Sequence, residues 1–258
     1  MNPQYNINRN LEQVARQLYD YWFVQFDFPN QEGKPYKSSG GEMVWNDKLK
    51  RDIPKKWDNA SLIDIANITM GQSPEGSSYN VNGEGVLFYQ GSTDFGIRFP
   101  KVRQYTTSPS RFAMKGDILM SVRAPVGTLN IANNDCCIGR GLAAMNSKIG
   151  SITHLYCVMC DFKSVFDQQN SAGTTFGSIT KDTLYRLDVL LPDSDTLKEF
   201  ERICNPIFDE QMRIGEQIVD LQRLRDELLP MLLNGQISVD EIKDYDFMPQ
   251  DLPMAAEP

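Results

Sequence analysis

The residues best suited to metal or redox chemistry are Cys157 and Cys160, spaced as C-x-x-C, together with the neighbouring His154. A zinc site of this spacing needs a second pair of ligands, and His154 is the only histidine in the chain. Five cysteines are an odd number for a chain of 258 residues, which indicates reduced thiols rather than a disulfide framework. We therefore expect no metal site, and we interpret His154 as a packed or surface residue rather than a base.

Sequence patterns of common catalytic sites are missing from the chain. It contains no G-x-x-x-x-G-K-[ST], no G-x-S-x-G and no H-E-x-x-H. The string Asn205-Pro206-Ile207-Phe208 is similar to the N-P-P-[FY] loop of base-modifying amino-methyltransferases. That loop follows a strand and accompanies a glycine-rich cofactor turn, whereas this string lies inside a helical repeat. We expect no catalytic residue and no cofactor in this chain.

Polar and basic residues mixed with glycine favour nucleic-acid binding instead. Arginine and lysine can donate to guanine, and glutamine can pair with adenine, when loops carry them into a groove. The segments are YQGSTDFGIRFPKVR, SVRAPVG, IGRGL and GTTFGSITK, and the last precedes an expected helix start that could bind a phosphate. Each segment alone also fits a solvated loop. The candidate DNA contacts are Gln90, Ser92, Thr93, Asp94, Arg98, Lys101, Arg103, Arg123, Arg140, Thr174, Thr175, Ser178 and Lys181.

The net charge of −8 argues at first against DNA, because lysine and arginine supply most non-specific affinity for phosphate. The charge is unevenly distributed, however. Residues 193–258 hold 6 basic and 16 acidic side chains, whereas residues 95–140 hold 7 basic and 2 acidic ones, a local balance of +5. The basic segment could face a phosphate backbone, and the acidic end suits a protein partner.

Both ends of the chain have the apolar spacing of amphipathic helices. In residues 8–26, Leu11, Val14, Leu18, Trp22 and Phe26 recur at three- and four-residue intervals. Residues 29–56 are rich in Gly, Pro, Ser and Lys, which predicts a linker that makes the helix and the next domain separate units.

The last helix has the strongest repeat. Apolar residues keep a 3-4 spacing from Leu197 to Leu232, which predicts a long helix that packs against another helix, with a kink at Pro206 and a stop at Gly235. The two helices could form an intramolecular hairpin or pair with a second chain. The expected partner-helix contacts are Leu11, Leu18, Trp22, Phe26, Ile214, Ile218, Leu221, Leu228 and Leu232.

Between these helices, short apolar runs alternate with glycine and proline, which favours strands with a few helices and an α+β fold. A helix start is expected at Ser178 or Thr180. The predicted organisation is a helix in 1–28, a linker in 29–56, a mixed α/β domain in 57–192, a long coiled-coil-type helix in 193–235 and an acidic tail in 236–258. No long apolar run or leader pattern occurs, so we expect a cytoplasmic protein without a membrane partner.

Seven strings, in order along nearly the whole chain, resemble the specificity subunit of type I restriction–modification enzymes. They are NRNLEQVARQLYDYWFVQFDFPN, GKPYKSSGGEMVW, YQGSTDFG, GDILMSVRAPVGTLNIA, CIGRGLAA, GTTFGSITKD and LRDELLPMLLNGQI. Members of that family contain two target-recognition domains, each followed by a long helix, and each domain reads one half of a split DNA site. This chain resembles a half subunit with one recognition domain.

The resemblance implies a non-catalytic subunit that reads double-stranded DNA. It implies that the helices dock methyltransferase (modification) subunits, which bind S-adenosylmethionine, and that a restriction subunit joins to translocate and cleave. It also implies that two copies could associate as a homodimer through the helices. Two other interpretations stay open: a coiled-coil adaptor whose domain binds protein, and an enzyme that uses Cys157 and Cys160.

Overall fold

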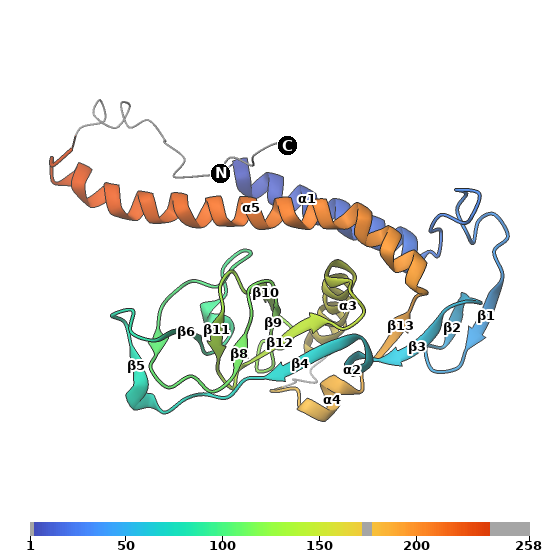
Figure 1. Ribbon diagram of the computed structural model, residues 1–258, viewed down its shortest axis with the longest axis horizontal. Helices are drawn as coiled ribbons and strands as arrows, with labels where there is room; N and C mark the ends of the chain where they lie inside the picture. Colours follow the sequence, from blue (N-terminus) through green and yellow to red (C-terminus); the bar gives the residue numbers. More distant parts are fainter. Residues whose placement is uncertain (1–2, 172–176, 238–258) are drawn as a thin grey trace, which may run out of the picture. The chain divides into compact units, whose positions relative to one another are not determined.

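The computed structural model describes residues 3–171 and 177–237. Internal contacts divide the chain into two compact units, Met1–Gly215 and Glu216–Pro258. The first unit carries all the described strands, and the second begins inside the last helix. Strands and long helices occur together in the described residues, so the α+β class is confirmed (Figure 1). The acidic tail predicted for 236–258 lies outside the described residues from residue 238 onward.

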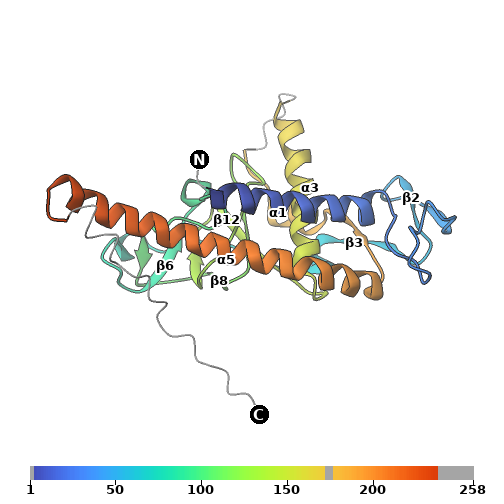
Figure 2. The same ribbon diagram turned by 90° about the horizontal axis from the view of Figure 1, so that it is seen from above.

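The N-terminal helix α1 spans Pro3–Tyr19 and continues into a π-helical turn, η1, at Asp20–Val24. Its buried aromatic side chains, Tyr19, Trp22 and Phe23, belong to the main hydrophobic core. The Phe23 ring lies 4.9 Å from that of Phe200 in the last helix, α5 (Ser194–Leu233). Figure 2 shows α1 running beside the first part of α5. The prediction that this helix and the following domain are separate units is therefore wrong.

The predicted linker contains an ordered hairpin. Strands β1 (Met43–Asn46) and β2 (Arg51–Pro54) pair antiparallel. Ile53 of β2 is buried in the main core. Nearby, the Phe28 ring is stacked between those of Tyr36 and Trp57, 4.7 Å from each. The prediction of an extended connection is wrong here, because aromatic stacking and hairpin pairing hold the segment against the domain.

Two sheets form the middle of the chain. The four-stranded sheet has the order β10-β9-β12-β4 and is antiparallel throughout. The five-stranded sheet has the order β5-β7-β6-β11-β8, and its β6–β11 pair is parallel. The bounds are β4 Ala66–Met70, β5 Tyr79–Asn80, β6 Val86–Tyr89, β7 Tyr105–Thr106, β8 Phe112–Ala113, β9 Ile118–Ser121, β10 Leu129–Ile131, β11 Cys136–Ile138 and β12 Leu142–Ser147.

Strand β9 of the four-stranded sheet is buried at every position, which explains why its sequence, Ile-Leu-Met-Ser, begins as an apolar run. Along β9, Leu119 belongs to a core built from both sheets, whereas Ile118 and Met120 belong to the main core. Successive strand side chains point to opposite faces, so both cores use the same strand. Leu142 and Ala143 of β12 divide between the two cores in the same way.

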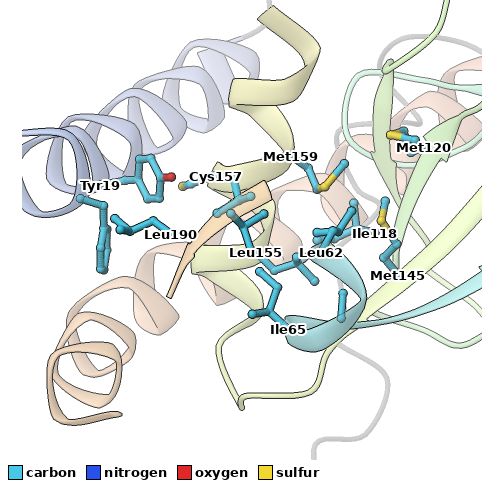
Figure 3. Close-up of a cluster of buried hydrophobic side chains, with 14 of the residues drawn as sticks. Tyr19, Leu62, Ile65, Ile118, Met120, Met145, Leu155, Cys157, Met159 and Leu190 are labelled. Atoms are coloured by element: carbon cyan, nitrogen blue, oxygen red, sulfur yellow. The ribbon is translucent and has the colours of Figure 1, made fainter. Parts of the chain in front are cut away.

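Helices cover the main-core face of this sheet. Helix α3 (Ile152–Ser171) contributes Leu155 and Met159, which lie near the short helix α2 (Leu62–Ile65) and the strand residues Ile118 and Met145 (Figure 3). Strands β3 (Asp58–Ser61) and β13 (Asp188–Leu191) form a separate antiparallel pair, and the short helix α4 spans Lys181–Tyr185. The helix start predicted at Ser178 or Thr180 is Thr180, whose Oγ1 accepts from the Thr183 amide.

Helix α5 begins at an aspartate cap, since Asp193 accepts hydrogen bonds from the Asp195 and Thr196 amides. The helix continues through Pro206, so the prediction of a long helix is confirmed, and the predicted kink at this proline stays a prediction. It ends as predicted before Gly235, which has a φ of +67°. The Gln236 amide donates to the Met231 carbonyl oxygen at 2.9 Å, the bond expected of a glycine-capped helix end.

Candidate nucleic-acid interface

Five strand ends meet at one edge of the two sheets. In the four-stranded sheet, Ser121 at the end of β9 pairs with Leu142 at the start of β12, and Met70 at the end of β4 pairs with the next residue of β12. In the five-stranded sheet, Tyr89 and Ile138 end the parallel strands β6 and β11 side by side. Four loops begin at these ends, because the loop between β11 and β12 joins two of them.

Backbone hydrogen bonds join these loops directly. The Gly141 amide donates to the Gln90 carbonyl oxygen at 3.2 Å, and the Val122 amide donates to the Gly141 carbonyl oxygen at 2.9 Å. The Gln72 amide donates to the Ile138 carbonyl oxygen at 3.0 Å. Several residues at or next to these hydrogen bonds have exposed side chains. We call the resulting patch the strand-end surface and define it as Gln72, Gln90, Arg123, Arg140 and Ser178.

Glycine makes this convergence possible. A Cβ atom on Gly71 would lie 2.1 Å from the carbonyl oxygen of Gly139, and one on Gly141 would lie 2.5 Å from that of Gln90. Both approaches are far too close for any side chain, so backbone contacts backbone at these positions. The glycines beside Arg140 thus serve to bring it next to Gln90.

Arg123 and Ser178 come together although they are distant in sequence. They form an isolated antiparallel bridge, flanked by a hydrogen bond from the Ile179 amide to the Val122 carbonyl oxygen at 2.9 Å. Both residues are exposed. The structure thus brings together four of the predicted DNA contacts, Gln90, Arg123, Arg140 and Ser178. Thr174 and Thr175, predicted in the same segment, lie outside the described residues.

A small groove beside this surface is lined by two basic side chains. It has a volume of about 200 Å³ and is lined by Arg111, Lys181 and Tyr185, among others. The Lys181 Nζ atom lies 5.1 Å from the centre of the Tyr185 ring. Ser110, next to Arg111, donates from Oγ to the Gln72 carbonyl oxygen at 2.7 Å, which places the groove next to the strand-end surface. Arg111 was not among the predicted contacts, although the basic balance of residues 95–140 includes it.

Residues 90–103 form a second loop with predicted contacts, which we call the 90–103 loop. A short 3-10 turn, η3, spans Ser92–Asp94. Asp94 is buried and accepts hydrogen bonds from the Gln90 and Gly91 amides, and its carboxylate lies 3.6 Å from Arg103 Nη1. The prediction that Asp94 contacts DNA is therefore wrong, because its carboxylate holds the turn together. Thr93, Lys101 and Arg103 are exposed and Ser92 is half-buried.

Arg98, another predicted DNA contact, is buried. Only 6% of the residue is exposed. The guanidinium lies over the rings of Tyr156 and Phe208, at 5.0 and 4.8 Å from their centres, rather than facing solvent. The prediction of a DNA contact is wrong for Arg98, because aromatic side chains from α3 and α5 cover it.

The predicted partner-contact residues of the first unit divide by burial. Trp22, Phe26 and Ile214 are buried by the chain's own side chains. The prediction that they contact a partner is therefore wrong, and the apolar spacing at these positions serves the chain's own packing. Leu11 and Leu18 are half-buried, and Leu18 packs against the main core.

In the second unit, the predicted partner contacts differ among themselves. Ile218 is buried, Leu228 and Leu232 are half-buried, and Leu221 is exposed. Contact of these residues with a partner stays a prediction.

The C-x-x-C residues are poorly placed for nucleophilic chemistry. Cys157 is buried, and burial raises the pKa of the Cys160 thiol to about 12. A thiol with so high a pKa is protonated at neutral pH, and the thiolate is the reactive form. His154 is packed in the core, and burial lowers its pKa to about 3. Among the described residues, no group of three or more His, Cys, Asp or Glu could hold a metal ion, and no helix is long and apolar enough to span a bilayer.

Comparison with known proteins places this fold in a class. The chain is 33% identical over 194 residues to a putative type I restriction enzyme MjaX specificity subunit of Methanocaldococcus jannaschii, covering 73% of this chain and 45% of that protein. It is 26% identical over 253 residues to the MjaIX specificity subunit of the same organism, covering 91% and 55%. The crystal structure of the HsdS subunit from Thermoanaerobacter tengcongensis matches with a TM-score of 0.51 and 26% identity, covering 91% and 53%.

Residues 54–224 match the family model described as the type I restriction modification DNA specificity domain. The chain therefore belongs to this family. It spans about half the length of the relatives it matches.

Proposed function

We propose that this chain reads a DNA sequence for a type I restriction–modification enzyme. The observation that carries the proposal is the strand-end surface, where loops after β4, β6, β9 and β11 bring Gln72, Gln90, Arg123 and Arg140 to one edge of the sheets. Ser178, in the segment before α4, joins them through its bridge to Arg123. Side chains that read base edges must be exposed, mixed in type and held by rigid elements. This edge has all three properties.

The side-chain types suit the edges of base pairs in a major groove. Arg123 and Arg140 could each donate two hydrogen bonds to a guanine, and Gln90 could pair with an adenine. Arg111, Lys181 and Lys101 are exposed nearby or on the 90–103 loop and suit phosphates, which position a protein without reading sequence. The proposed interface therefore separates base-reading residues from phosphate-binding ones.

Methyl transfer and cleavage belong to other subunits in this proposal. A methyltransferase subunit binds S-adenosylmethionine and reacts with the base, and a restriction subunit translocates and cleaves DNA. The high pKa of the Cys160 thiol supports a non-catalytic role for that cysteine. All of these components would work in the cytoplasm.

The helices are the proposed docking elements. Ile7, Val14 and Tyr21 recur every seventh residue in α1 and η1 and are 48%, 49% and 37% exposed, an apolar stripe that residues 3–171 and 177–237 leave uncovered. Methyltransferase subunits or the helices of a second copy could cover it. Pairing of two copies of this chain would read a symmetric split sequence, whereas pairing with a different second reader would make the DNA site asymmetric.

The test uses the full chain assembled with its methyltransferase. Affinity for a library of duplexes should reveal a preferred sequence, and it should fall steeply with salt. Arg123→Ala should lower the affinity for the preferred duplex by about 1–3 kcal/mol and relax the preference at one base position.

Lys34→Ala is the matched control, since Lys34 is an exposed cation in the loop before β1 and pairs with Glu32. It should leave both affinity and preference unchanged. Equal binding of every duplex by the wild-type complex would refute the proposed function. A preference that survives both Arg123→Ala and Gln90→Ala would remove the strand-end surface from it.

A further inference from the structure

Arg98 is a buried cation that is hydrogen-bonded to helix α5. Its Nη2 atom donates to Oε1 of Gln211 on α5 at 3.2 Å. The Nε and Nη1 atoms are buried and have no hydrogen-bond partner among the described residues. A guanidinium held this way is costly to bury, since only two aromatic faces and one amide oxygen compensate for lost water. An apolar side chain would fill the same space at a lower desolvation cost.

Gln211 extends this contact to the N-terminal helix. It is 2% exposed, and its Nε2 atom donates to the Asn8 carbonyl oxygen at 3.3 Å. In return, Asn8 Nδ2 donates to the Gln211 carbonyl oxygen at 3.2 Å. Arg98, Gln211 and Asn8 therefore form one chain of hydrogen bonds from the 90–103 loop through α5 to α1. A polar residue in an otherwise apolar helical repeat fixes how neighbouring elements align.

The residue after Arg98 makes a second contact with α5. Phe99 is buried, and a Cβ atom on Gly215 would lie 2.6 Å from its ring. The ring thus rests directly on the helix backbone, one helical turn beyond Gln211. Two adjacent residues of the 90–103 loop are seated on α5 by independent contacts.

We propose that Arg98 is a positioning residue: it fixes the 90–103 loop against the α1 and α5 helices, so that the sequence preference depends on a side chain that touches no DNA. The inference rests on the proposed function. The network of Arg98, Gln211 and Asn8 connects the 90–103 loop to α1 and α5. That loop presents Gln90, Lys101 and Arg103, and the helices are the proposed docking elements for partners. Charge alone is not sufficient, because the planar guanidinium must lie on two rings while it donates to Gln211.

The experiment compares Arg98→Met with Lys101→Met in the full chain assembled with its methyltransferase. Lys101 is the matched control, an exposed cation of the same loop. Affinities for the preferred duplex and for a scrambled duplex are measured over a range of salt concentrations. The slope of log affinity against log salt counts the phosphates that the protein neutralises, at about 0.9 for each.

Arg98→Met should lower the preference for the preferred duplex by roughly tenfold, the size of one lost base contact, with an unchanged salt slope. Lys101→Met should reduce the slope by about one and leave the preference intact. Arg98→Lys, which keeps the charge, should lose preference like Arg98→Met. Gln211→Met breaks the network from the helix side and should reproduce the loss, which decides the matter if Arg98→Met does not fold.

Two results would overturn the inference. One is a slope that falls by about one in Arg98→Met, which would mean a direct phosphate contact. The other is a preference that Arg98→Met and Gln211→Met both retain. Absence of a sequence preference in the wild-type complex would instead refute the proposed function. Failure of the inference and failure of the proposed function are therefore distinguishable.

Discussion

Lowering the pH from about 7.5 to about 5.5 should reduce the free energy of unfolding by about 1.4 kcal/mol, through the side chain of His154. This histidine is 1% exposed, and its ring packs edge-on against Phe23 with 4.7 Å between centres. Neither ring nitrogen has a hydrogen-bond partner among the described residues. Burial without a partner disfavours the charged ring and lowers its pKa to about 3.

The sign follows from comparing the folded and unfolded chains. An unfolded histidine has a pKa of about 6.5, so below that pH the unfolded chain binds a proton that the folded chain does not. Stability is therefore full above about pH 6.5 and falls as the pH drops toward the folded pKa, by up to about 1.4 kcal/mol per pH unit. His154 is the only histidine in the chain, which makes the window near pH 6 specific to it.

The assay is urea unfolding at both pH values, with the midpoint and slope fitted separately. The control is His154→Leu, which replaces the ring with an apolar side chain that does not titrate. Its unfolding free energy should be nearly constant between the two pH values. A wild-type protein that is equally stable at both, or a His154→Leu variant that loses as much as wild type, would refute the reasoning.

Three further predictions concern Gly215, Glu201 and the cysteine pair. Gly215→Ala should destabilise the protein in thermal melts although alanine favours a helix by about 1 kcal/mol, because its Cβ atom would press on Phe99; a raised melting temperature would contradict this. Glu201→Ala should cost about 3 kcal/mol in urea unfolding, because the Ser151 and Thr153 hydroxyls and the Thr153 amide all donate to its buried Oε1 and would lose their acceptor. Glu201→Gln should cost less, and equal costs would show that these hydrogen bonds contribute little. The double variant Cys157→Ala, Cys160→Ala should keep full DNA preference in the binding assay, and loss of preference from a folded protein would revive a role for the thiols.

The elements with regular periodicity could be predicted from the sequence. Helix α5 was predictable because its three- and four-residue spacing is local, and Gly235 marked its end. The hairpin at 43–54 was missed because Gly, Pro, Ser and Lys around it are typical of a linker. A weak signal was present in Val44-Trp45 and in Ile53, which flank the turn.

The sequence indicated which residue types could form the candidate site, but it did not indicate which of these residues are buried. Arg98 and Arg123 both lie near glycines or small residues, and nothing local distinguishes them. Arg98 is buried because Phe208 and Gln211, the latter 113 residues away, approach it in the folded chain. Asp94 had a local signal, because an aspartate three residues after Gly91 can close a short helical turn.

We propose that this chain chooses the DNA sequence on which its partners act. The most direct measurement maps methylated bases across the genome of cells that carry the methyltransferase with and without this chain. We predict one recurrent split motif that requires the chain and changes when Arg123 or Gln90 is replaced by alanine. Methylation that is identical with and without the chain would contradict the account.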